Sequence, residues 1–362
     1  MSIFETIKKS IPQTQLKVLE ETYSKSTVVI TGGASFIGSH LSDCLIDLGS
    51  KVTVIDDLSS GKKENMAASP SINFVNFDLR NLAGVQEILT GADYVFHLAA
   101  IHGGRGFIES FKAEMLANLA IDNNVFSSAV AVGVKTVVHA SSACAYPVDL
   151  QMSETQQNLL AEFQGSMNKS ETCFADGVYG WTKLFGEYQL ENQVSGSTTK
   201  GRSARIFTAY GDRENESHAA IALIAKALLK ADPYPIWGNG EQTRNFTYVS
   251  DTVAGLLLLG SDKRELSFDV FNIGTSHHVK VIDFVKEIFL QIGWEPSRLD
   301  LQIDKPVGVA SRASDNSKIK SIFGWEPSLE VPDGLARTIA WYKDSGHVPE
   351  SLEELERKLM SR

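Results

Sequence analysis

The chain has 362 residues, of which 43% are hydrophobic and 22% are charged, an ordinary composition for a soluble globular protein. Its formal net charge of −10 argues against a general nucleic-acid-binding protein, because such proteins carry a basic surface. The three cysteines, Cys44, Cys144 and Cys173, argue against a disulfide framework and favour a reducing compartment.

Residues 1–25 form an amphipathic polar extension that lacks the apolar core and the small-residue cleavage site of a signal peptide. No stretch of the chain approaches the roughly 20 continuous apolar residues of a membrane span. We therefore expect a cytoplasmic protein without a membrane partner. The extension itself either caps the fold or contacts a second subunit.

From residue 26 onward, short β-branched segments alternate with helical patterns. The expected strands are residues 26–31, 51–55, 72–77, 94–98, 136–140 and 202–207. The expected helices are residues 36–48, 82–89, 109–131 and 179–193. Because the connections are short, the alternation predicts right-handed βαβ units and an α/β fold of the Rossmann type, with a doubly wound parallel sheet. We assign residues 26–210 to this nucleotide-binding domain.

After Tyr210 the pattern loosens, and loops at 232–235 and 238–240 interrupt it. Further helices are expected at residues 219–230, 250–259 and 281–293. Residues 211–362 are therefore expected to form mainly a smaller, mixed substrate-binding lobe. This lobe is interleaved with the first domain and completes a cleft.

A turn rich in small residues joins the first strand to the first helix. Such a turn lets the backbone approach a pyrophosphate, whose charge the helix N-terminus favours. Ser35 stands where the middle glycine of this pattern usually stands, and a tight turn without a ligand would also explain the glycines. The predicted cofactor contacts of the turn are Gly32, Ser35, Phe36, Ile37 and Gly38.

Asp56 ends the second strand about 20 residues after the turn, the position of an acid that binds ribose hydroxyls. A carboxylate there repels a 2′-phosphate. The sequence therefore favours NAD over NADP as the cofactor.

Tyr179 and Lys183 stand four residues apart, on one face of an expected helix. A nearby ammonium lowers the pKa of a phenol, which would suit Tyr179 to act as a general base, although a surface pair would show the same spacing. Ser142 follows a buried strand some 40 residues upstream. Together with the turn and Asp56, this set resembles the extended short-chain dehydrogenases, the family of NAD-dependent nucleotide-sugar epimerases and dehydratases.

The resemblance extends from about residue 27 to residue 344. It implies that Ser142 hydrogen-bonds the reacting oxygen, that Tyr179 exchanges its proton and that Lys183 holds the nicotinamide ribose. It also implies a nucleotide-diphosphate sugar as the substrate and a homodimer built on helices 109–131 and 179–193. Further cofactor contacts by resemblance are Asp78, Leu79, Leu98, Ala99 and Ala100, and Arg244 and Arg312 match arginines that meet the phosphates of the substrate.

Residues 142–147 distinguish branches of this family. They resemble the Ser-x-Cys-x-Tyr-Pro segment of the GDP-mannose 3,5-epimerases and GDP-L-fucose synthases. The loop with Gly103, Gly104 and Arg105 is similar to the first of these, and we place it in the substrate pocket. A sugar 4,6-dehydratase would carry an Asp-Glu pair shortly after the serine, where this chain has Ala-Cys-Ala, so dehydration is disfavoured.

A second acid/base pair is expected from the same comparison. Cys144 matches the cysteine of that segment, and Ser217-His218 matches the Ser-His of the GDP-L-fucose synthases. Oxidation at carbon 4 of a sugar acidifies the hydrogens on carbons 3 and 5. A thiolate can remove one of them and an imidazolium can return a proton on the other face. A simpler interpretation is that Cys144 is a small hydrophobic residue of the core and that His218 is a polar residue of a loop.

The sequence therefore predicts an NAD-dependent nucleotide-sugar epimerase that acts through a 4-keto sugar, with proton exchange at carbon 3, carbon 5 or both. The open alternatives are a plain 4-epimerase, an epimerase-reductase like GDP-L-fucose synthase, a uronic acid decarboxylase and a non-catalytic NAD-binding protein. We expect no metal site, because no ligand set accompanies His277 and His278.

Overall fold

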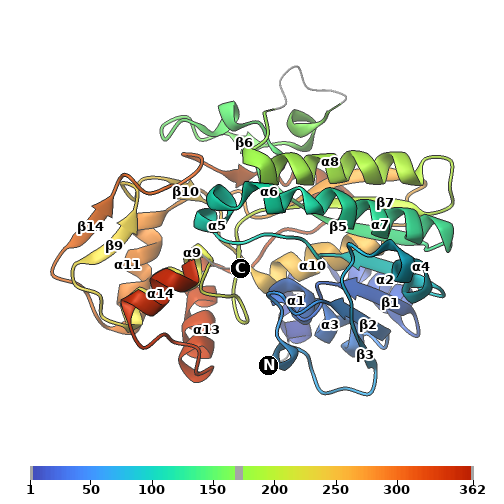
Figure 1. Ribbon diagram of the computed structural model, residues 1–362, viewed down its shortest axis with the longest axis horizontal. Helices are drawn as coiled ribbons and strands as arrows, with labels where there is room; N and C mark the ends of the chain where they lie inside the picture. The colour runs from blue at the N-terminus through green and yellow to red at the C-terminus, as the bar shows by residue number, and fades with distance from the viewer. Residues whose placement is uncertain (1–2, 168–173, 360–362) are drawn as a thin grey trace.

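The computed structural model describes residues 3–167 and 174–359, and a seven-stranded sheet lies at its centre (Figure 1). The strand order is β12-β7-β5-β4-β1-β2-β3, and every neighbouring pair is parallel. The strands are β1 (Thr27–Thr31), β2 (Lys51–Asp56), β3 (Ile72–Asn76), β4 (Tyr94–His97), β5 (Thr136–Ser142), β7 (Lys200–Ile206) and β12 (Phe268–Ile273). The Rossmann-type parallel sheet predicted from the alternating pattern is confirmed.

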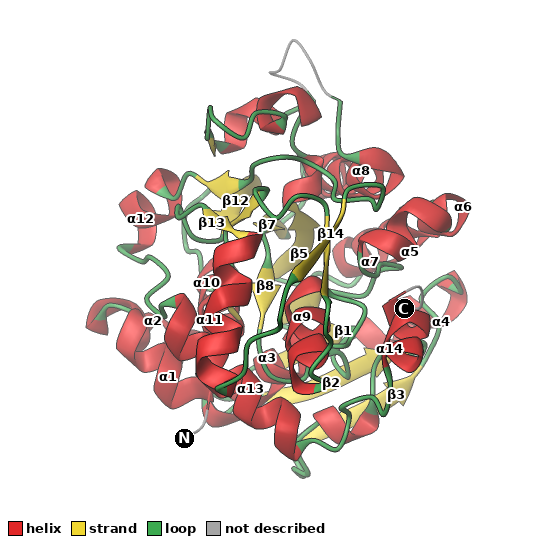
Figure 2. Cartoon of the chain, turned by 90° about the vertical axis from the view of Figure 1, so that its left-hand side faces the viewer, coloured by secondary structure: helices red, strands yellow, loops and turns green. Residues whose placement is uncertain are grey.

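Helices cover both faces of the sheet (Figure 2). One face carries α1 (Ile3–Ser10), α2 (Gln13–Tyr23), α3 (Phe36–Asp47) and α10 (Val249–Gly260). The other face carries α4 (Leu82–Leu89), α7 (Ala117–Ala131) and α8 (Gly177–Val194). The strand order reverses at β1, which lies between β2 and β4, and ligands of such sheets bind in the crevice at this switch point.

The edge strand β12 was not predicted as a strand, and it comes from the C-terminal half of the chain. It pairs with β7 from Phe268 to Ile273, so the two halves of the chain share one sheet. The remainder of the C-terminal half forms the lobe. Its helices are α9 (Ala219–Leu228), α11 (Val281–Ile292), α12 (Ser317–Phe323), α13 (Val331–Asp344) and α14 (Leu352–Leu359).

Further short strands pair outside the central sheet. They are β8 (Ala209–Tyr210) with β11 (Thr247–Tyr248), β9 (Tyr234–Trp237) with β14 (Leu299–Gln302), β10 (Thr243–Arg244) with β13 (Val279–Lys280), and β6 (Leu159–Leu160) with β15 (Ala313–Ser314). The last pair brings the segment around residue 312 against the segment that follows β5. Residues from both halves of the chain therefore meet at the carboxyl end of the sheet.

The N-terminal extension packs on α10. The side chains of Leu19 and Tyr23 are fully buried in the core, and the Tyr23 hydroxyl donates to the Leu257 carbonyl at 2.7 Å. Of the two roles left open for the extension, the structure shows that it caps the fold. Residues 1–2 and 360–362 and Cys173 lie outside the described residues.

The single helix expected at residues 109–131 is wrong. The chain forms three helices here, α5 (Arg105–Ser110), α6 (Lys112–Met115) and α7. Phe111 separates the first from the second, because its backbone (φ −116°, ψ 49°) is not helical. Arg105 is the first residue of α5, directly after Gly104. Among the described residues, no helix combines the length and the apolar character needed to cross a membrane.

Candidate active site

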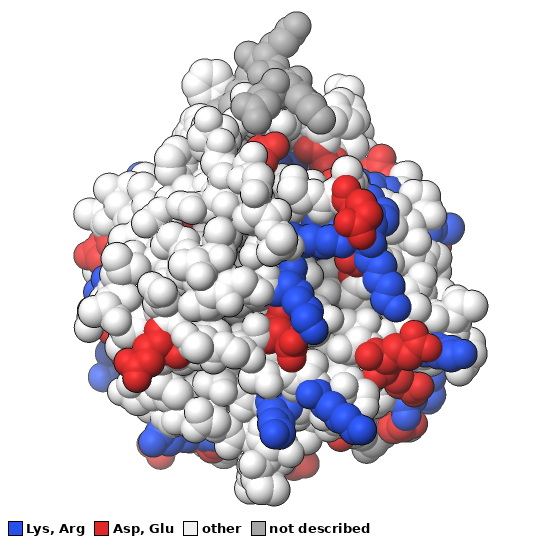
Figure 3. Space-filling view, turned by 90° about the vertical axis from the view of Figure 1, so that its right-hand side faces the viewer, with Lys and Arg blue, Asp and Glu red and all other residues white. Residues whose placement is uncertain are grey.

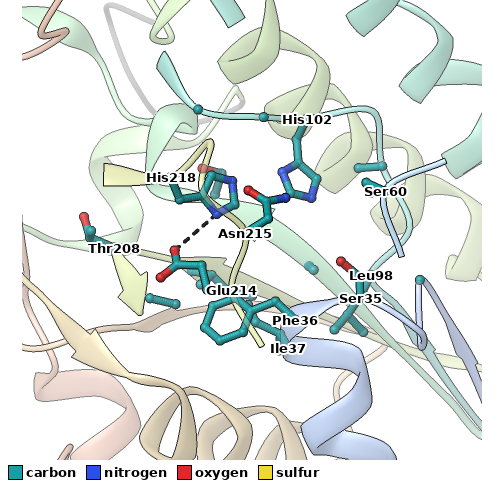
Figure 4. A pocket seen from close by; sticks show the side chains of 18 of the residues that line it. Ser35, Phe36, Ile37, Ser60, Leu98, His102, Thr208, Glu214, Asn215 and His218 are labelled. Atoms are coloured by element: carbon teal, nitrogen blue, oxygen red, sulfur yellow. Dashed lines mark hydrogen bonds and ion pairs between the residues drawn. The ribbon is translucent and has the colours of Figure 1, made fainter. Parts of the chain in front are cut away.

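A cavity of about 330 Å³ opens at the carboxyl end of the sheet, between the turn after β1 and the loop before α9 (Figure 4). It brings together residues that were predicted from separate motifs. The predicted site residues that line it are Gly32, Ser35, Phe36, Ile37, Gly38, Leu98, Ala100, Gly103, Gly104, Ser142, Cys144, Tyr179, Lys183, His218 and Arg312. The cofactor motif and the catalytic motifs therefore face one space.

The turn after β1 requires its glycines. Gly32 has φ +69°, and a Cβ there would lie 2.9 Å from the backbone nitrogen of Ala99. A Cβ on Gly38 would overlap the carbonyl oxygen of Gly32. Ser35 precedes α3 in extended backbone and makes no capping hydrogen bond with its side chain. The turn thus leaves a cradle at a helix N-terminus that fits a dinucleotide pyrophosphate.

A smaller adjoining hollow of about 70 Å³ lies at the ends of β2 and β4. Asp56 lines it and is held by two backbone donors, Ala34 N at 3.0 Å and Leu58 N at 2.9 Å. A fixed carboxylate here fits the hydroxyls of a ribose. The other predicted residues in this hollow are Gly32, Ser35, Leu79, Leu98, Ala99 and Ala100.

Asp78 lines neither the cavity nor the smaller hollow. It is 43% exposed and pairs with Arg80 at 2.6 Å, and the hydrogen bond from that guanidinium holds the pKa of Asp78 below its usual range. The predicted adenine contact of Asp78 stays a prediction.

Ser142 ends β5, and Tyr179 and Lys183 face it from consecutive turns of α8. Lys183 Nζ donates to the Ala140 carbonyl at 2.8 Å and lies 5.9 Å from the centre of the Tyr179 ring. Burial, and then the charges of Cys144 and Asp122, raise the pKa of Tyr179 above its usual value. The prediction that Tyr179 has a lowered pKa is therefore wrong, because burial dominates and raises it.

Cys144 lies in a 3-10 turn directly after β5 and contacts an arginine from the lobe. Arg312 Nη1 donates to the Cys144 sulfur at 3.3 Å, and Nη2 donates to Asp176 at 2.9 Å. Burial lowers the pKa of Arg312, but Cys144 and Asp176 more than offset this, so that its pKa lies above the usual value. Arg105 also donates to Asp176, at 3.0 Å. Arg312, a predicted phosphate ligand, and Arg105, a predicted pocket residue that does not line the cavity, thus share one carboxylate beside the thiol.

Arg244 lies behind this group and does not line the cavity. Its guanidinium donates to the carbonyls of Thr243 and Val307, each at 2.7 Å. Burial, together with the charges of Arg312 and Arg105, lowers the pKa of Arg244 to about 9. The guanidiniums of Arg105 and Arg312 both donate to Asp176, and Arg105 also pairs with Glu109 at 2.6 Å. With Arg244 nearby, three guanidiniums stand against two carboxylates, and one surplus positive charge suits an anionic ligand group.

His218 precedes α9 and enters the cavity from the opposite half of the chain to Cys144. Its Nδ1 lies 3.1 Å from Glu214 Oε1, and its ring stacks on the ring of His102 with 5.6 Å between the ring centres (Figure 4). Sequence reasoning assigned no role to Glu214, Asp176 or His347, although Glu214 and His347 also line the cavity. Asp176 could have been noticed as the acid just before α8; no local signal marks His347.

Comparisons with known proteins show the family of this chain. A model of the NAD dependent epimerase/dehydratase family matches residues 28–274. GDP-mannose 3,5-epimerase 1 of Oryza sativa subsp. japonica is 32% identical over 330 residues, covering 88% of this chain and 82% of that protein. UDP-glucuronic acid decarboxylase 1 of Arabidopsis thaliana is 28% identical over 332 residues, covering 88% of this chain and 70% of that protein. A solved structure of MoeE5 in complex with UDP-glucuronic acid and NAD superposes with a TM-score of 0.75 at 29% identity, covering 88% of this chain and 100% of that chain.

Proposed function

The chain belongs to the NAD dependent epimerase/dehydratase family, and we propose that it is a nucleotide-sugar epimerase that acts through a transient 4-keto sugar with proton exchange at carbon 3, carbon 5 or both. The observation that carries the proposal is the Cys144–Arg312 contact in the same cavity as Ser142, Tyr179 and His218. The similarity to GDP-mannose 3,5-epimerases supports it, and the similarity to a UDP-glucuronic acid decarboxylase makes decarboxylation the main rival.

NAD is the cofactor of this family, and when bound it takes up and returns the hydride of the sugar. The cradle with Gly32 and Gly38 and the carboxylate of Asp56 would hold it. In our proposal, Ser142 donates a hydrogen bond to the oxygen on carbon 4, and Tyr179 accepts the proton of that hydroxyl and later returns it. The proton of that hydroxyl is returned within one cycle, so Ser142 and Tyr179 end as they began.

The 4-keto group makes proton removal at the neighbouring carbons possible. Cys144, as a thiolate beside the Arg312 guanidinium, takes the proton from carbon 3 or 5, and the electron pair moves into the enolate. His218, as an imidazolium, then donates a proton to the other face of that carbon. The carbon is inverted, the thiol keeps the substrate proton and the imidazole is left neutral, until both groups exchange with water.

The decisive experiment incubates the protein with NAD in D₂O and follows GDP-mannose, UDP-sugars and dTDP-sugars by NMR. We expect deuterium at carbon 3 or 5 of an inverted sugar in the wild type and none in C144A. The matched control is C44A, because Cys44 is the other cysteine in the described part of the chain and is buried in the core. Inversion at carbon 4 without deuterium would mean a 4-epimerase, and release of CO₂ from a uronic acid would mean a decarboxylase; either result contradicts the proposal.

We also propose that the protein is a homodimer that pairs through α7 and α8. Trp181, Phe185 and Tyr188 are 41%, 40% and 38% exposed on one side of α8. Figure 3 shows charged side chains gathered on one half of this end of the molecule, whereas the half on the side of α7 and α8 carries few. A second copy fits this face because two such helices from each subunit would bury the aromatic side chains. Sedimentation of F185E should yield a monomer where the wild type sediments as a dimer; a monomeric wild type would contradict the proposal.

A further inference from the structure

The loop between β8 and α9 holds an acid directly beneath the His218 ring. Glu214 Oε1 lies 3.1 Å from His218 Nδ1, and Figure 4 shows the two side chains facing each other at the edge of the cavity. The Glu214 side chain is 3% exposed and the His218 side chain is 23% exposed. The contact is thus shielded from water on the glutamate side and open on the histidine side.

This contact determines which histidine nitrogen carries the proton. A carboxylate can only accept hydrogen bonds, so Nδ1 must be the donor, and Nε2 is left to exchange a proton. Burial raises the pKa of Glu214, and the hydrogen bond and charge of His218 offset only part of this rise. The second carboxyl oxygen, Oε2, is buried without a partner in the described part of the chain, so His218 is the main side-chain partner that stabilises the charged form.

A second imidazole holds the plane of the ring. His102 stacks on His218 with an interplanar angle of 21°. The two loops that carry these residues touch, since a Cβ on Gly104 would overlap the carbonyl oxygen of Ser217. The close approach at Gly104 therefore allows the two rings to stack. It also explains why residue 104 is a glycine, independently of any contact with the substrate.

We infer that Glu214 and His102 are positioning residues for His218. Glu214 keeps one proton on Nδ1, so that Nε2 is the nitrogen that exchanges a proton with the substrate. His102 fixes the plane of the ring. The inference rests on the proposed role of His218 in proton exchange. In a single proton transfer, Nε2–H donates to the substrate carbon, and the neutral ring that remains keeps its Nδ1–H bonded to Glu214. Without Glu214, neutral His218 could adopt either tautomer.

The first test is spectroscopic and needs no substrate. Nitrogen-15 NMR of the histidine-labelled full chain should show neutral His218 as the Nδ1–H tautomer, with H218N used to assign the signal. In E214Q the amide can donate as well as accept, so the signal should move toward a mixture of tautomers. The matched control is E216Q, because Glu216 lies in the same loop but contacts Tyr342 and Lys358. An unchanged His218 tautomer in E214Q would overturn the inference.

The second test measures deuterium uptake into the sugar. We expect E214Q to slow it by roughly 10- to 100-fold, as for other residues that orient a reacting histidine. H102A should slow it as well, while H102F, which keeps a stacked ring, should restore most of the rate. Equal loss in H102A and H102F would overturn the role of His102. If E214Q changes the tautomer but the wild type takes up no deuterium, the proposed function fails and the Glu214–His218 contact stands.

Discussion

Arg312 donates to the sulfur of Cys144 at 3.3 Å, and the same guanidinium donates to Gln151 and Asp176. Three directed hydrogen bonds hold it in place, so its charge is fixed beside the thiol rather than free to follow a phosphate. A guanidinium that donates to a cysteine sulfur stabilises negative charge on that sulfur as it reacts. The arginine that the sequence assigned to the substrate phosphates is thus also a neighbour of the proposed base.

The first prediction follows from this contact. R312Q should slow the alkylation of Cys144 by iodoacetamide at pH 7.5, and by about 10-fold or more, since a lost charge-assisted hydrogen bond costs roughly 1.5–3 kcal/mol. Mass spectrometry of the peptide that contains Cys144 measures the rate at that thiol alone. R312K keeps the positive charge but loses the planar guanidinium, so its alkylation rate should lie between those of R312Q and the wild type. Equal alkylation rates in R312Q and the wild type would show that Arg312 does not affect the thiol.

The second prediction concerns the cofactor. D56N should weaken NAD binding by about 10-fold and reduce the preference for NAD over NADP. The reason is that the variant lacks the carboxylate that accepts hydrogen bonds from the ribose hydroxyls and repels a 2′-phosphate. Isothermal titration calorimetry with both cofactors measures this. D47N is the control, since Asp47 is an exposed acid at the end of α3 that lines neither the cavity nor the hollow. If D47N changes the preference as much as D56N, general charge and not the position of Asp56 selects NAD.

Local spacing predicted most of the cofactor half of the site. The turn from Gly32 to Gly38 and the pair Tyr179 and Lys183 are short-range patterns, and their geometry follows from one strand end and one helix face. The parallel sheet followed from the alternation of strands and helices. These features depend on neighbours in the sequence, and so a sequence can show them.

The remainder depends on contacts between distant residues. The Arg312–Asp176 pair joins residues 136 positions apart, and no local pattern marks either as the partner of the other. The direction of the pKa shift of Tyr179 depends on how deeply the fold buries the phenol, which spacing does not report. The break at Phe111 is a local change of backbone conformation, in a segment whose apolar periodicity reads as one helix.

The third prediction uses the burial of Tyr179. Since burial raises its pKa, the phenol is protonated at neutral pH and the phenolate fraction increases with pH. If the phenolate accepts the substrate proton, the rate of the first hydride transfer should rise from pH 6 to pH 9, by up to about tenfold for each pH step of one. This rate is read as the appearance of NADH in a single turnover, because that step precedes those assigned to Cys144 and His218. Y179F should abolish turnover, whereas Y94F, at the far end of β4, should retain both the rate and the profile. A rate that is flat or falls over this range would contradict a general-base role for Tyr179.

The fourth prediction concerns the N-terminal extension. Leu19 is fully buried against the core that α10 shares, so L19A leaves a cavity and should lower the free energy of unfolding by about 2–5 kcal/mol. Urea denaturation followed by circular dichroism measures this. K17A is the matched control, because Lys17 is exposed on the same helix and its loss should change stability by less than about 0.5 kcal/mol. Equal stability of L19A and K17A would mean that α2 does not pack on α10 in solution. Another segment would then have to bury the face of α10 where the Leu257 carbonyl accepts from Tyr23.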